Sequence, residues 1–169
     1  MSKPSTDQYP EYFQTYVNKV AEDDLSIAFE NQKTRLNNLL DSIPEAKRNF
    51  RYAPGKWTVQ EVIQHCMDTE RIFAYRALCI ARNETASLPG FDENKYAAAA
   101  NADKRNWDDV VEEINAVRQS TELLFHSFTA EQLRASGIAN NKSFSVEAIG
   151  FIIVGHLHHH LSIIQERYL

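Results

Sequence analysis

Apolar residues recur every three or four positions along four long stretches of this chain, which is the pattern of amphipathic α-helices. The stretches cover residues 24–43, 58–83, 107–128 and 145–167. All five prolines lie outside them, as expected for a residue that interrupts helices. The sequence therefore predicts an all-α protein built on four main helices.

Polar residues at the starts of these stretches are of the kind that cap helices. Asp23 or Asp24 precedes the first helix, and Ser145 precedes the last. Thr58 and Glu61 have the spacing of a capping box, in which each side chain accepts a hydrogen bond from the backbone N–H of the other. These residues support the expected helix starts.

The chain is expected to form one domain over residues 1–169, with residues 1–22 as an N-terminal extension. Its length and its apolar content of 43% allow it to bury a core without disulfide or metal staples. Residues 85–106, between the second and third helices, form a long connection of the kind that shapes binding sites. We find no alternating pattern with turn residues that would predict a β-hairpin.

Charge and cysteine content narrow the class of protein. A net charge of −5 argues against nucleic-acid binding, which depends on clustered lysines and arginines. No apolar run is long enough to cross a membrane, and the first residues lack the plan of a signal peptide, so a cytoplasmic location is expected. Cys66 and Cys79 lie on one expected helix, too far apart for a disulfide, and are expected to be reduced.

Five of the six histidines fall in two places, one in the second helix and four in the last. His156 and His160 are one turn apart and continue the apolar face of the last helix, so both are expected to point into the core. His65 lies at the edge of the apolar face of its helix and can reach the same interior. His158 is expected to face solvent. His159 is a candidate for holding a metal-ligating histidine in position without binding the metal itself.

Three inward-facing imidazoles predict a metal site. A neutral imidazole in an apolar interior needs partners for its nitrogens, and a divalent metal satisfies one of them. Histidine nitrogens suit zinc, nickel, iron or copper better than magnesium or calcium, and three protein ligands leave one position open, as in catalytic sites. Spacing alone leaves an alternative, in which the histidines form hydrogen bonds within the core and hold no metal.

Several motifs in matching order resemble the DinB-like superfamily, specifically its small DinB/YfiT-type bundle proteins. The similarity covers roughly residue 25 to the end of the chain. Each motif is short, and their combined order and spacing make the resemblance specific. The motifs are residues 55–62 (GKWTVQEV) with His65, residues 70–76 (ERIFAYR), residues 88–96 (LPGFDENKY), Val117-Arg118 with Thr121, and residues 155–161 (GHLHHHL).

The resemblance implies an up-down-down-up four-helix bundle whose metal triad maps onto His65, His156 and His160. It also implies an activity, because characterised relatives include metal-dependent transferases of low-molecular-weight thiols and thiol-dependent isomerases, with zinc or nickel as the usual metal. A thiol S-transferase is therefore the first expectation. The alternatives are a metal-dependent hydrolase, in which the site activates water, and a non-catalytic metal-binding bundle.

The expected partner is a small-molecule substrate, with a low-molecular-weight thiol as the first candidate. Apolar faces left on the first and third helices are available for a homodimer contact. Trp57, Tyr75, Arg71 and Arg76 also resemble recurring family positions. We interpret Trp57 as a packing residue and the two arginines as members of ion pairs, and we leave all four out of the site.

Overall fold

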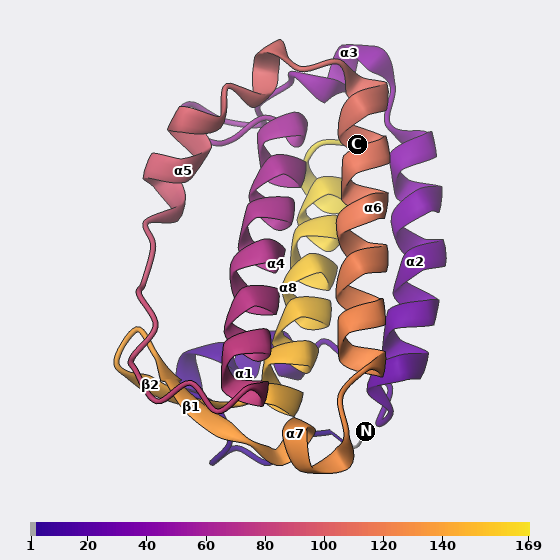
Figure 1. The fold of residues 1–169 in the computed structure, drawn as a ribbon. Helices are drawn as coiled ribbons and strands as arrows, with labels where there is room; N and C mark the ends of the chain where they lie inside the picture. Colours follow the sequence, from indigo (N-terminus) through magenta and orange to yellow (C-terminus); the bar gives the residue numbers. More distant parts are fainter. Residues whose placement is uncertain (1–2) are drawn as a thin grey trace.

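Four long helices form the body of the molecule in the computed structural model, which describes residues 3–169 (Figure 1). They are α2 (Leu25–Ser42), α4 (Val59–Ala81), α6 (Trp107–His126) and α8 (Val146–Arg167). α2 and α8 run in one direction and α4 and α6 in the other, so the order is up, down, down, up. The predicted all-α four-helix bundle is confirmed.

Short elements connect the long helices. α4 and α6 are parallel neighbours, so the chain between them must return along the length of the bundle (Figure 1). That return contains the helix α5, within the stretch that the sequence predicted as a long connection. The short elements are η1 (Glu11–Phe13), α1 (Gln14–Val17), α3 (Glu45–Arg48), α5 (Glu93–Ala100), η2 (Ala102–Lys104) and α7 (Ala130–Arg134).

The helix starts are capped as the sequence indicates. Asp24, and not Asp23, caps α2, because its side chain accepts hydrogen bonds from the backbone N–H groups of Ser26 and Ile27. Thr58 and Glu61 form the reciprocal capping box of α4, and Ser145 accepts a hydrogen bond from the backbone N–H of Ala148 in α8. The box fixes the start of α4 two turns before His65.

A β-hairpin precedes α8, so the expectation of no hairpin is wrong. Strands β1 (Ser136–Ala139) and β2 (Lys142–Ser145) pair antiparallel. Asn140 and Asn141 connect them with φ values of 49° and 58°. A two-residue turn with two positive φ angles matches strand twist, and asparagine adopts this conformation without a glycine. The adjacent asparagines are the sequence signal for this turn, although the short strands beside them show no clear alternation of apolar and polar residues.

Helix α8 is buried on all sides over much of its length, with residues 148–158 buried without a break. The bundle covers one side, and α1 with the flanking N-terminal segment covers the other. His158 lies on this second side, buried, with Nδ1 3.3 Å from the carbonyl oxygen of Lys19. The expectation that His158 faces solvent is therefore wrong. The expected N-terminal extension begins with residues 1 and 2, which lie outside the described residues.

Gly155 permits α1 to approach α8 closely, and Gly155→Ala is expected to separate them. A Cβ atom at this position would overlap the backbone carbonyl of Tyr16, which cannot rotate away as a side chain can. Such overpacking costs about 1–3 kcal/mol. Chemical denaturation should therefore show a lower free energy of unfolding, despite the better helix propensity of alanine.

Gly150→Ala provides the comparison on the same helix. Its Cβ would meet only side-chain atoms of Leu25 and Phe125, so we expect a smaller loss of stability than at Gly155. A Gly155→Ala protein as stable as the wild type would contradict the proposed close approach.

Two further sequence expectations can be compared with the structure. Cys66 and Cys79 are both free thiols, as expected. Among residues 3–169, no helix combines the length and apolar character needed to span a membrane.

Candidate metal centre

The side chains of His65 in α4 and of His156 and His160 in α8 converge inside the bundle. Nε2 of His156 lies 3.1 Å from Nε2 of His65 and 3.2 Å from Nε2 of His160. One nitrogen from each of the three residues lies within 4.8 Å of the others. The structure thus brings together the three histidines that the sequence singled out.

Hydrogen bonds among the three rings cannot account for both close nitrogen contacts of His156. A neutral imidazole nitrogen is either a donor or an acceptor, and never both. If Nε2 of His156 carries a proton, it can donate to one neighbour only; if it does not, two donors compete for one lone pair. At least one of these two contacts therefore lacks a good hydrogen bond. A cation between the rings would accept a lone pair from all three nitrogens.

Burial keeps the three rings neutral at physiological pH. It lowers the pKa of His65 to about 4 and that of His160 to about 3. Burial also holds the pKa of His156 well below its usual range, and the other histidines lower it further. A metal ligand must be the neutral imidazole, so the environment favours the ligating form.

The spacing of the three nitrogens fits a small divalent cation. A tetrahedral zinc site with bonds of about 2.0–2.1 Å places neighbouring ligand nitrogens about 3.3 Å apart. The two contacts to His156, at 3.1 and 3.2 Å, are close to that value. Three nitrogen ligands suit a borderline metal such as zinc or nickel, and leave at least one coordination position open.

Neighbouring side chains hold the rings in place. The Trp57 ring lies over His65 with centroids 4.7 Å apart, and the Tyr16 ring meets His156 edge-on at 5.3 Å. Thr69 Oγ1 lies 3.4 Å from Nδ1 of His65, on the side of the ring opposite the convergence point. Contacts of this kind orient a ligand ring so that its free nitrogen faces the metal position.

The three histidines line a cavity of about 560 Å³. This volume is in the range of small-molecule sites. Aromatic rings form much of the wall, and exposed residues of α5 and the hairpin form part of its edge. The aromatic residues are Tyr12, Phe13, Tyr16, Trp57, Phe73 and Phe91.

Sequence reasoning missed several residues of this cavity. Glu93, Arg76 and Lys142 all line it with the histidines. Arg76 was assigned to an ion pair, yet among residues 3–169 it has no carboxylate partner. Arg71 does form the expected pair, with Glu113 at 2.6 Å.

His159 lies beside the triad and not within it. Its ring is half-buried, 5.1 Å from the His160 ring and 5.5 Å from the Tyr16 ring. It lines a separate cavity on the outer side of α1. A supporting role for His159 stays a prediction.

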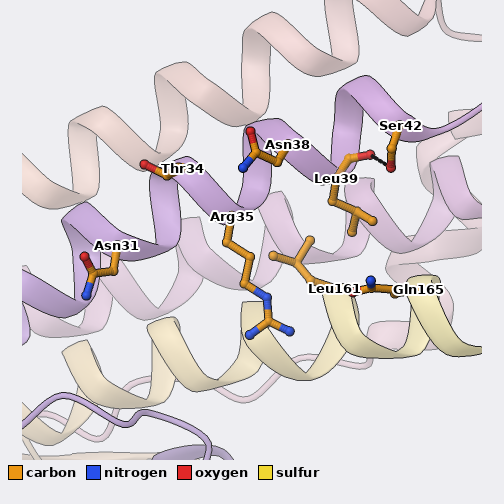
Figure 2. A pocket seen from close by; sticks show the side chains of 8 residues that line it. All are labelled: Asn31, Thr34, Arg35, Asn38, Leu39, Ser42, Leu161 and Gln165. Carbon is orange, nitrogen blue, oxygen red and sulfur yellow. Dashed lines mark hydrogen bonds between the residues drawn. The ribbon is translucent and has the colours of Figure 1, made fainter.

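A larger cavity of about 670 Å³ lies between α2 and α8, away from the histidines (Figure 2). Its polar residues are neutral amides and hydroxyls together with Arg35, which donates a hydrogen bond to Ser162 Oγ. Despite its size, it offers no histidine, cysteine or carboxylate ligand for a metal and no base to activate its hydroxyl groups.

The fold and the site together define a four-helix bundle with a buried three-histidine cluster open to a small-molecule cavity. The DinB superfamily model matches residues 28–164, and the chain belongs to this superfamily. A search of curated proteins finds no match. Among solved structures, the chain is similar to YfiT from Bacillus subtilis, described as a probable metal-dependent hydrolase with an unusual four-helix bundle topology. The two share 17% identity and a TM-score of 0.70, over 97% of this chain and 90% of YfiT.

Proposed function

We propose that this chain is a metal-dependent enzyme acting on a small molecule, with one zinc or nickel ion held by His65, His156 and His160. The observation that carries the proposal is the convergence of three neutral imidazole nitrogens at a 560 Å³ cavity. When bound, such an ion supplies Lewis-acid chemistry, lowering the pKa of a thiol or a water molecule that takes the open position.

The first reaction we propose is thiol S-transfer. The aromatic wall provides apolar contact area for an organic thiol and its electrophile, and it limits the access of water to the reacting atoms. Family membership supports this assignment, because the resemblance noted above includes transferases of low-molecular-weight thiols.

Hydrolysis is the second candidate, and Glu93 favours it. Glu93 begins α5, is exposed at the cavity, and its charge raises the pKa of His65 against the effect of burial. A carboxylate in this position is suited to accept a proton from an attacking water molecule. The likeness of the fold to YfiT, described as a probable metal-dependent hydrolase, is consistent with this candidate.

Elemental analysis of untagged protein is expected to find one zinc or nickel ion per chain. The cobalt-substituted protein should then gain a thiolate-to-metal absorption band when glutathione, bacillithiol or mycothiol is added. The thiol that gives the band should also support transfer to an electrophile. Protein that holds metal but shows neither a band nor turnover with any thiol would rule out S-transfer, and Glu93→Gln would then be tested on hydrolysis substrates.

A further inference from the structure

Arg76 lies in the wall of the cavity that contains the three histidines, on the same face of α4 as His65. Eleven residues separate the two, which is three helical turns and a rise of about 16 Å. Helical side chains lean toward the N-terminus of their helix. The Arg76 side chain therefore leans along α4 toward the histidines, and the helical rise keeps its guanidinium group apart from the metal position along the length of the cavity.

The guanidinium group of Arg76 has unused hydrogen-bonding capacity although only 5% of the residue is exposed. Nη2 donates to the carbonyl oxygen of Pro89 at 2.7 Å. Nε is buried and has no hydrogen-bond partner among the described residues. Burial lowers the pKa of this group, and no charged neighbour contributes to the shift. A buried cation without a carboxylate is costly, so its retention calls for an anionic partner from outside the chain.

The other buried arginine of the bundle shows how an internal partner satisfies such a group. Arg118 donates to Glu70 at 2.8 Å and also to Gln32. Arg76 differs in lining the cavity, and its Nε–H is buried without a partner among the described residues. The paired N–H groups of a guanidinium match the two oxygens of a carboxylate or phosphate.

A second cation lines the same cavity. Lys142 is exposed on the hairpin, directly after the Asn140 and Asn141 turn. Glu93 is the single carboxylate among the residues that line the cavity. The cavity therefore carries more positive than negative charge in a chain of net charge −5, before any divalent cation is added. Such a local field attracts anions.

We propose that Arg76 and Lys142 form an anion-binding subsite, and that the substrate is a small molecule carrying a carboxylate or phosphate group well separated from its reacting atom. This inference rests on the proposed function, because it takes the histidine centre as the reacting end of the cavity. Arg76 binds and orients the anionic end, and Lys142 adds a solvent-exposed charge at the other wall.

The test follows the Nε–H resonance of Arg76 by NMR while inorganic phosphate, or acetate in a second series, is added to the full chain. Metal-free protein is used first, so that an anion cannot bind through the metal. We expect a saturable shift of this resonance, and the anion with the higher affinity identifies the preferred group. Arg76→Gln should abolish anion binding measured by calorimetry, whereas Arg71→Gln, on an exposed arginine of the same helix, should leave it unchanged.

Arg76→Lys retains the charge and removes the paired N–H groups, so it should bind the preferred anion about tenfold more weakly, equivalent to about 1.4 kcal/mol. An Arg76 resonance that does not respond to either anion, or anion binding that survives in Arg76→Gln, would overturn the proposal. Zinc is then added to the same metal-free samples, and its uptake reports separately on the metal centre. Anion binding without zinc uptake would reject the proposed metal-dependent enzyme and support the anion subsite. Zinc uptake without anion binding would support the metal centre and reject the anion subsite.

Discussion

His156→Ala is expected to reduce the metal content of the protein from one ion per chain to background. Nε2 of His156 is the nitrogen that lies within 3.2 Å of both other ligand candidates. Without it, His65 and His160 offer only two ligands. Changes to groups that merely support a ligand typically cost 10–100-fold in affinity, so removal of the central ligand should cost more than about 100-fold. Elemental analysis and zinc titration measure both quantities.

The matched control is His159→Ala, which changes the same residue type on the same helix outside the converging set. It should retain one ion per chain. Thermal unfolding gives an independent reading, because a metal present at about a thousand times its dissociation constant stabilises the folded state by about 4 kcal/mol. That metal-dependent stabilisation should be present in His159→Ala and absent in His156→Ala. Equal metal content in the two variants would contradict the three-histidine centre.

The sequence was sufficient to predict the bundle and the convergence of three histidines. A helix repeats every 3.6 residues, so His156 and His160 had to share a face, and the apolar residues around them identified that face as the inner one. The position of His65 relative to them depended on how α4 packs on α8. That packing is a feature of the tertiary structure, which residue spacing alone does not determine. The family resemblance indicated that His65 faces the pair in α8.

The prediction for His158 failed because the same reasoning assumes that one face of each helix meets water. In α8 the outer face is covered by α1, and Gly155 makes this contact possible by presenting no Cβ to Tyr16. Nothing in the local sequence of α8 reveals a cover that comes from residues more than a hundred positions earlier. Periodicity identifies a polar face but does not show what lies against it.

The cavity residues outside the triad were missed for a related reason. Glu93 and Lys142 come from a long connection and from a hairpin, and Arg76 is three turns from His65 along α4. None belongs to a motif with a fixed spacing to the histidines. Glu93 reaches the cavity because α4 and α6 are parallel, so the connection between them must return along the bundle (Figure 1), whereas Lys142 is brought there by the hairpin before α8.

A buried polar network links all four long helices. Arg118 in α6 donates to Glu70 in α4 at 2.8 Å and to Gln32 in α2, and Gln32 donates to the carbonyl oxygen of Val154 in α8 at 2.6 Å. The Arg118 and Glu70 side chains are only 6% and 5% exposed. Oε1 of Glu70 is buried without a partner among the described residues, so Arg118 is the main compensation for this carboxylate.

Arg118→Met is therefore expected to lower the free energy of unfolding by about 3–5 kcal/mol, the usual effect of removing one partner of a buried ion pair. Chemical denaturation of the metal-free protein measures this change. Arg71→Met is the matched comparison, because Arg71 and Glu113 pair the same two helices with side chains 48% and 27% exposed. An exposed pair contributes at most about 1 kcal/mol, so this variant should lose far less stability.

Glu70→Leu combined with Arg118→Met separates the charge effect from the loss of packing. The double variant removes both buried charges, and apolar replacement of a whole buried pair is often neutral or stabilising. It should therefore recover most of the stability that Arg118→Met loses. If the double variant is as unstable as the single one, the loss comes from the contact of Arg118 with Phe29 and Gln32, and not from an uncompensated carboxylate.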